Sequence, residues 1–137
     1  MYSWITEEKT YEGFPLFLRR PIDVDTPEHR QCFPNLAIIT HSFSERLPDG
    51  RPEPQYNRKL EQLDHDIVTA FDASQSGLPI LVEAFGGERN YYFCMSPEAD
   101  ISSIFAPIAA AHPTEQLKWE RRSQNGWQFL DDYTASV

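Results

Sequence analysis

Cysteine, glycine and positive charge are scarce in this chain. Its 137 residues include two cysteines, six glycines, and 12 Lys plus Arg against 21 Asp plus Glu, a formal net charge of −9. One disulfide between Cys32 and Cys94 is possible, but a chain of this length needs no covalent staple and shows no export signal, so we expect two reduced thiols. No apolar run approaches the ~18 residues of a membrane span. The first residues lack a basic leader and an apolar signal stretch, which predicts a cytoplasmic location.

The acidic residues are spread along the chain and form no acidic tail. A negative surface repels phosphate backbones and anionic lipids, so we predict neither a nucleic-acid partner nor a membrane partner. A basic protein surface is electrostatically better matched. The charge balance therefore favours another protein as the partner, with a second copy of the chain as an alternative.

The apolar and aromatic fractions, 40% and 13%, provide enough material for one core. We expect a single domain over 1–137. Within it, residues 1–33 are expected to form a β-hairpin and a loop, and residues 34–123 are expected to form the core. Residues 124–137 are expected to form a short C-terminal segment with a helical turn. The hairpin strands are expected over Ser3–Lys9 and Phe14–Arg20, about a Glu12-Gly13 turn.

The core shows two pairings of strand with helix. A β-branched run over 35–43 predicts a central strand. An apolar stripe predicts a helix over 55–73, and a hairpin follows about a Gly86-Gly87 turn. A second helix is expected after Ser96 as its cap, kinked or split at Pro107, and a last strand over 115–124. The order β-α-β-β-α-β predicts an α+β, ferredoxin-like (split βαβ) antiparallel sheet with two helices and the added N-terminal hairpin.

The stripe of the first helix has members spaced four, three, four and four residues apart. They are Tyr56, Leu60, Leu63, Ile67 and Phe71. The opposite face carries charged side chains, which we expect to be solvated: Arg58, Glu61, Asp64, Asp66 and Asp72.

Three stretches resemble a bacterial family catalogued as a domain of unknown function, number 695. They are "EGFPLFLRR", "GGERNYYFCMSPEAD" and "NGWQFLDDY". The residues that carry the resemblance are Gly13, Pro15, Arg19, Gly87, Arg89, Tyr91, Phe93, Trp127 and Tyr133. The family usually has Asp-Pro before the Trp, where this chain has Asn125-Gly126. Some members are similar to protein regulators of ribonuclease E, which are acidic ferredoxin-like inhibitors, so the resemblance implies regulatory protein binding without catalysis.

The strand over 88–95 also suggests an RNA-binding sheet. Arg89, Tyr91 and Phe93 alternate onto one face, as stacking residues do in RNA-recognition domains. Asn90 and Tyr92 stand where small residues are typical, and the net charge of −9 opposes phosphate. Packing within the sheet is the better interpretation.

Chemistry-bearing motifs are weak elsewhere. The four histidines are expected at the surface or rim, and "HRQC" has no second ligand pair nearby, so no metal and no cofactor is predicted. Carboxylate pairs such as Asp64/Asp66 lack an apolar setting that would separate their pKa values. No catalytic residue is assigned.

Two functions remain open. The first is a non-catalytic protein-binding or regulatory module; the alternative is a small-molecule-binding or enzymatic domain with a pocket between the sheet and the terminal segments. The terminal aromatics are expected to cover the open sheet face, or else to form an exposed partner surface. The candidate contact residues for a partner or ligand are Arg19, Arg89, Tyr91, Trp127 and Tyr133.

The register of the second hairpin decides what Arg89 meets. A three-residue loop over 86–88 would place Arg89 and Glu83 on one face, within reach of each other. A two-residue Gly86-Gly87 loop would place them on opposite faces. We predict the three-residue loop, because a buried arginine needs a carboxylate or an aromatic partner.

Overall fold

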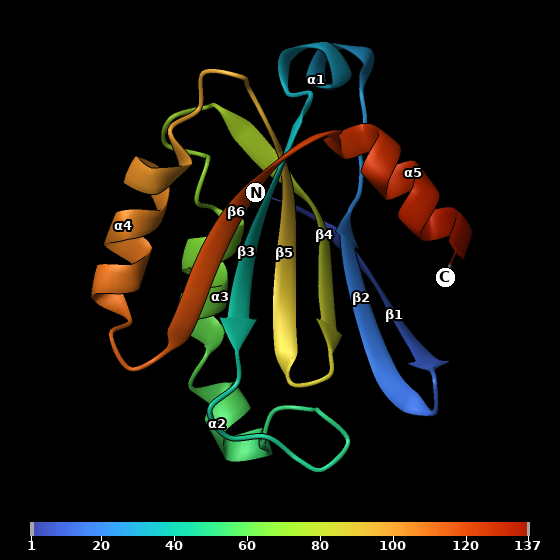
Figure 1. Ribbon diagram of the computed structural model, residues 1–137, viewed down its shortest axis with the longest axis vertical. Coiled ribbons are helices and arrows are strands. Elements are labelled where there is room, and N and C mark those ends of the chain that lie inside the picture. The colour runs from blue at the N-terminus through green and yellow to red at the C-terminus, as the bar shows by residue number, and fades with distance from the viewer. Residues whose placement is uncertain (1, 137) are drawn as a thin grey trace.

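The computed structural model describes residues 2–136 as an α+β protein with a six-stranded antiparallel sheet (Figure 1). The strand order is β1-β2-β4-β5-β3-β6. The strands are β1 (Trp4–Tyr11), β2 (Phe14–Pro21), β3 (Asn35–Ser42), β4 (Gly77–Phe85), β5 (Glu88–Met95) and β6 (Gln116–Asn125). The helices are α1 (Pro27–Cys32), α2 (Pro54–Arg58), α3 (Glu61–Val68), α4 (Ile101–Ala111) and α5 (Gly126–Ser136). None of the helices within 2–136 is long and apolar enough to cross a membrane.

The predicted N-terminal hairpin is confirmed. Tyr11 pairs with Phe14, and Glu12 and Gly13 both have positive φ, the geometry of a two-residue type I′ turn. Strand β2 pairs with β4, so the hairpin adds two strands to the edge of the sheet and does not fold over its face.

Helices α3 and α4 cover one face of the sheet, with α2 at its end (Figure 1). The predicted apolar stripe is fully buried, and Phe71 and Ile67 have no exposed surface. The prediction of a single helix over 55–73 is wrong in detail, because a tight turn at Lys59-Leu60 separates α2 from α3. The turn still buries both Tyr56 and Leu60.

Two other helix predictions need correction. The loop expected near Pro27 contains α1, whose first turn is capped by the Thr26 hydroxyl accepting from the His29 N–H at 3.1 Å. The second helix does not begin at Ser96. It begins at Ile101 because the Asp100 carboxylate caps it, and it continues as one helix through Pro107.

The C-terminal helix α5 covers the other face of the sheet, on the side away from α3 and α4 (Figure 1). Asn125 caps it, accepting from the backbone N–H groups of Trp127 and Gln128 at 2.9 and 3.0 Å. The Phe129 ring stacks on Tyr92 with 4.7 Å between ring centroids. The expectation that terminal aromatics cover the open face is therefore confirmed for the C-terminal segment, which is a helix of 11 residues and not one turn.

The predicted register of the second hairpin is wrong. Phe85 pairs with Glu88 and Glu83 pairs with Asn90, so the loop is Gly86-Gly87 alone. Both glycines have positive φ, which permits a two-residue turn that fits the twist of the strands. Arg89 consequently lies on the face covered by α2 and α3, and Glu83 lies on the face covered by α5.

Candidate functional site

The added hairpin makes the sheet wider than its helices. A helix is about 10 Å across and strands lie about 4.8 Å apart, so two helices cover roughly four strands. On the face of α3, the part of the sheet formed by β2 and β4 is left beside a hollow of about 640 Å³. We call this hollow the arginine pocket, because its walls include Arg19, Arg51, Arg58 and Arg89.

An ion pair forms the inner end of the arginine pocket. Arg19 on β2 donates two hydrogen bonds to the Asp64 carboxylate on α3, at 2.6 and 3.0 Å. The buried Tyr91 hydroxyl donates a third bond to Asp64 at 2.7 Å. Burial acts to raise the pKa of Asp64, but Arg19 and Tyr91 outweigh it and lower that pKa. The Arg19 guanidinium also lies 4.8 Å from the centre of the Trp4 ring.

The outer part of the arginine pocket holds cations without carboxylate partners. Arg89 donates to the Asn57 side-chain oxygen at 3.2 Å and lies over the Phe43 ring at 5.2 Å. Within residues 2–136, neither Arg89 nor Arg58 has a carboxylate oxygen within ion-pair distance. Their guanidinium groups are therefore the ones best placed to meet an incoming ligand.

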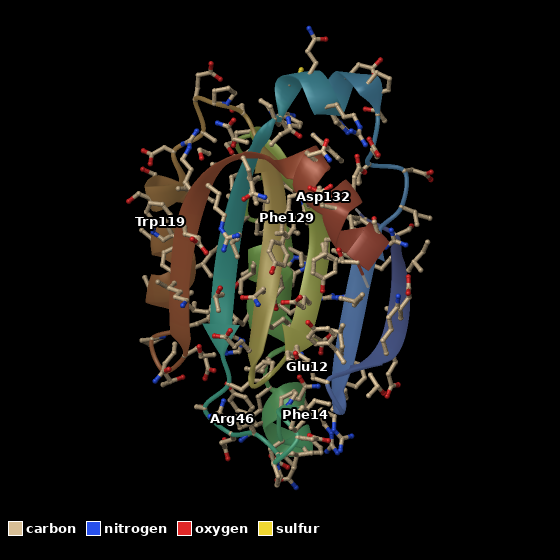
Figure 2. All side chains as sticks on the ribbon, turned by 45° about the vertical axis from the view of Figure 1, so that its right-hand side comes forward. Glu12, Phe14, Arg46, Trp119, Phe129 and Asp132 are labelled. Carbon is tan, nitrogen blue, oxygen red and sulfur yellow. The ribbon has the colours of Figure 1, made fainter. Side chains whose placement is uncertain are left out.

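The second wall of the arginine pocket is a loop held against the β4–β5 turn. Phe43 donates its N–H to the Gly87 carbonyl at 2.9 Å, and Gly50 packs so closely on Gly86 that a Cβ there would lie 3.0 Å from its Cα. A Cβ on Gly87 would collide with the Arg46 guanidinium. Figure 2 shows Arg46 at the same end of the molecule as Glu12 and Phe14, which mark the tip of the N-terminal hairpin. These contacts fix the loop that carries Arg51 and Pro52 into the pocket.

The charge of the arginine pocket is opposite to that of the whole chain. Four arginines and three carboxylates line it, a net charge of +1, whereas the chain carries −9. The remaining wall is largely apolar, from side chains such as Phe17, Leu60 and Val82. Cations above apolar walls fit a small organic anion.

A second polar cluster lies buried at the end of β3, next to Arg89. His41 has no exposed surface, and its Nε2 lies 2.9 Å from a carboxylate oxygen of Glu115. Because an ionised carboxylate can only accept, the Nε2–H is the donor. The Tyr56 hydroxyl donates to the same carboxylate at 2.5 Å. The His41 Nδ1 is buried without a hydrogen-bond partner among the described residues. Burial lowers the pKa of His41 against the opposing effect of Glu115.

Two predictions about exposure are therefore wrong, one for a histidine and one for a carboxylate. His41 is a core residue and not a surface one, and Asp64 is paired in a pocket and not solvated. For His41 the sequence held a usable signal, because it shares a strand face with Ala37 and Ile39. For Asp64 no local signal exists, since its partner Arg19 is 45 residues away.

The candidate contact residues divide between the two faces of the sheet. Arg19, Arg89 and Tyr91 come together at the arginine pocket. Trp127 is 1% exposed on the side of α5 that faces the sheet, and its Nε1–H donates to the Phe33 carbonyl at 3.0 Å. Tyr133 also lies on the α5 face, donating to Glu83. The sequence did not predict Arg51, Asn57 and Arg58 as contact residues. The folded loop and α2 bring them to the pocket.

The part of the chain that the structure describes holds no group of three or more His, Cys, Asp or Glu arranged to bind a metal ion. Comparison of the chain with family models, curated proteins and solved structures finds no match.

Proposed function

We propose that this protein is a non-catalytic binding protein that takes a small organic anion in the arginine pocket. The observation that carries the proposal is the pair Arg58 and Arg89. Among the described residues, neither guanidinium group has a carboxylate oxygen at ion-pair distance, and both line a partly apolar hollow of about 640 Å³. Guanidinium binds carboxylate and phosphate groups through paired, charge-assisted hydrogen bonds. A hollow of this size is within the range of small-molecule sites.

The side chains in the pocket favour binding over catalysis. A general base must be able to take a proton, but Asp64, the partly buried carboxylate at the inner end of the pocket, already accepts from Arg19 and Tyr91. Burial raises the pKa of Tyr91 and outweighs the lowering effect of Arg89, which keeps the phenol protonated. These groups hold the pocket in shape, and Arg89 and Arg58 supply the recognition.

The ferredoxin-like topology is part of the same proposal. The strand order β4-β5-β3-β6 and the crossovers through α3 and α4 support it. The hairpin β1-β2 then counts as an addition, and the arginine pocket is where that addition meets the core. The regulatory protein partner implied by the family resemblance stays a prediction.

Calorimetric titration with phenyl phosphate and benzoate tests the proposal. Both anions should bind, and the neutral benzyl alcohol should bind about tenfold or more weakly, since a hydrogen bond to a charged group is worth about 1.5–3 kcal/mol. Arg89→Gln should weaken anion binding by a similar factor. Added salt should weaken it further.

The matched control is Arg122→Gln, which removes an exposed arginine paired with Glu120 on β6, away from the pocket. It should bind phenyl phosphate as the unaltered protein does. Equal affinity for the anions and the alcohol, or equal effects of the two arginine variants, would contradict the proposal.

A further inference from the structure

A second pocket lies on the opposite face of the sheet, between the hairpin and α5. It has a volume of about 390 Å³. Neighbouring residues of β4 point into the two pockets, because side chains alternate along a strand. Val82 and Ala84 line the arginine pocket, and Glu83 and Phe85 line this second one.

Four aromatic rings line this second pocket, one from β1, one from β4 and two from α5: Tyr11, Phe85, Phe129 and Tyr133. The Tyr11 and Phe85 rings meet edge to face at 5.7 Å, and the Phe129 and Tyr133 rings lie 5.9 Å apart. Figure 2 shows Phe129 on α5 at the sheet face. We call these four rings the aromatic cage, because rings that line one pocket from separate elements are an arrangement that attracts cations to electron-rich ring faces.

The charged groups of the aromatic cage are all negative. Glu83 and Asp132 line it, and no lysine or arginine does. The cage therefore has a charge opposite to that of the arginine pocket. Two carboxylates with no lysine or arginine beside them in the lining repel an anion and attract a cation.

The hydrogen bonds of Glu83 narrow the kind of cation. Its Oε1 accepts from the Asn90 amide at 3.0 Å and the Tyr92 hydroxyl at 3.4 Å. Its Oε2 accepts from the Tyr133 hydroxyl at 2.5 Å. Three of the roughly four acceptor positions of a carboxylate are thus occupied. The carboxylate offers charge with little remaining capacity for new donors, which suits a cation that has no N–H to donate.

We propose that the cage of Tyr11, Phe85, Phe129 and Tyr133, with Glu83 and Asp132, binds a methylated organic ammonium ion carried on a small molecule. The rings supply cation–π attraction to a weakly hydrated head group. The carboxylates supply the counter-charge. This site is on the other side of the sheet from the arginine pocket and does not depend on it.

Choline is the probe, and the neutral alcohol in which carbon replaces its nitrogen is the matched control ligand. Titrations followed by ligand-observed NMR should show binding of choline and much weaker binding of the alcohol. Tyr11→Ala should weaken choline binding about 2- to 30-fold, the range that corresponds to one lost cation–π contact of about 0.5–2 kcal/mol. Glu83→Gln, which removes the charge and keeps one of the two oxygen acceptors, should also weaken it.

Tyr11 is 51% exposed on the hairpin, so its replacement does not threaten the core. Asp131→Asn serves as the control variant, since Asp131 is exposed on α5 and does not line the cage. Arg89→Gln should leave choline binding unchanged, which separates this test from that of the arginine pocket. Absence of choline binding at millimolar concentrations, equal binding of choline and the alcohol, or full affinity in Tyr11→Ala would overturn the proposal.

Discussion

Individual side chains in this protein gain their roles from contacts that are distant in sequence. Arg89 was expected to meet Glu83, six residues before it, but it lies over Phe43 and bonds to Asn57. A two-residue turn in place of a three-residue one moves every later residue of the strand to the opposite face. One residue of loop length therefore decides that Arg89 faces a pocket.

Trp127 shows the reverse case, a residue expected as a contact and found in the core. It is 1% exposed, its N–H is bonded to the Phe33 carbonyl, and the Arg30 guanidinium lies 5.5 Å from the centre of its ring. Trp127→Ala loses these apolar contacts, so its free energy of unfolding, measured by urea titration, should be about 3–5 kcal/mol lower. Trp127→Phe should lose less, about 1–3 kcal/mol, because it keeps an aromatic ring but leaves a carbonyl without its donor.

Unaltered stability in Trp127→Ala would contradict the core assignment. The partly exposed Trp119→Ala, 39% accessible on the edge strand β6, is the matched control and should lower the free energy of unfolding clearly less than Trp127→Ala does, because Trp119 buries less apolar surface. A loss of partner binding in Trp127→Ala would report unfolding and not a lost contact.

At the scale of elements, the cap of α5 decides whether the sheet face is covered. Asn125 ends β6 and accepts from the N–H groups of Trp127 and Gln128. Its replacement by Ala should cost about 0.5–2 kcal/mol of unfolding free energy, as measured by denaturant titration. Asn125→Asp should preserve stability, because Asp accepts the same bonds and adds a negative charge at the helix N-terminus.

Because α5 carries Phe129 and Tyr133, Asn125→Ala should also weaken choline binding at the aromatic cage. Ser102→Ala changes an exposed side chain in the first turn of α4 and leaves the Asp100 cap in place, so it is the control for a helix change without loss of a capping side chain. Equal stability of Asn125→Ala and Ser102→Ala would show that Asn125 does not hold α5 in place.

For the whole molecule, His41 should make stability depend on pH. Burial lowers the folded-state pKa of His41 below the ordinary value of 6.5, so the unfolded chain binds a proton more readily. The free energy of unfolding should therefore be highest at pH values above 6.5, the ordinary pKa of histidine. It should decrease as the pH falls through that value. One proton limits the slope to about 1.4 kcal/mol per pH unit.

Urea unfolding between about pH 7.5 and about pH 5.5 checks this prediction. Asp64 and Glu115, whose pKa values are lowered, lose their contributions only as the pH falls through the acidic range of ordinary carboxyl groups, outside this window. His41→Gln should flatten the curve, and the exposed His65→Gln should leave its slope as it was. An unchanged slope in His41→Gln would show that His41 is not its source.

Local chemistry in the sequence determined most of the elements. Alternation and turn residues gave both hairpins, the β-branched run gave β3, and the stripe from Tyr56 to Phe71 gave the buried side of α2 and α3. These features depend on neighbours within a few residues, so they can be recognised without the fold. The break at Lys59-Leu60, the Asp100 cap and the helical form of residues 27–32 were missed, because each depends on a local choice between competing caps and turns.

The tertiary structure alone decided the pockets. The pairing of β2 with β4 sets the width of the sheet, and the Gly86-Gly87 register sets which side chains face each hollow. The ion pair of Arg19 with Asp64 and the bond of Tyr133 with Glu83 join residues 45 and 50 positions apart. The composition gives a net charge of −9 but does not say where in the structure the charged residues lie. Only the fold separates a cationic pocket on one face of the sheet from an acidic aromatic cage on the other, because strand alternation sends adjacent residues to opposite sides.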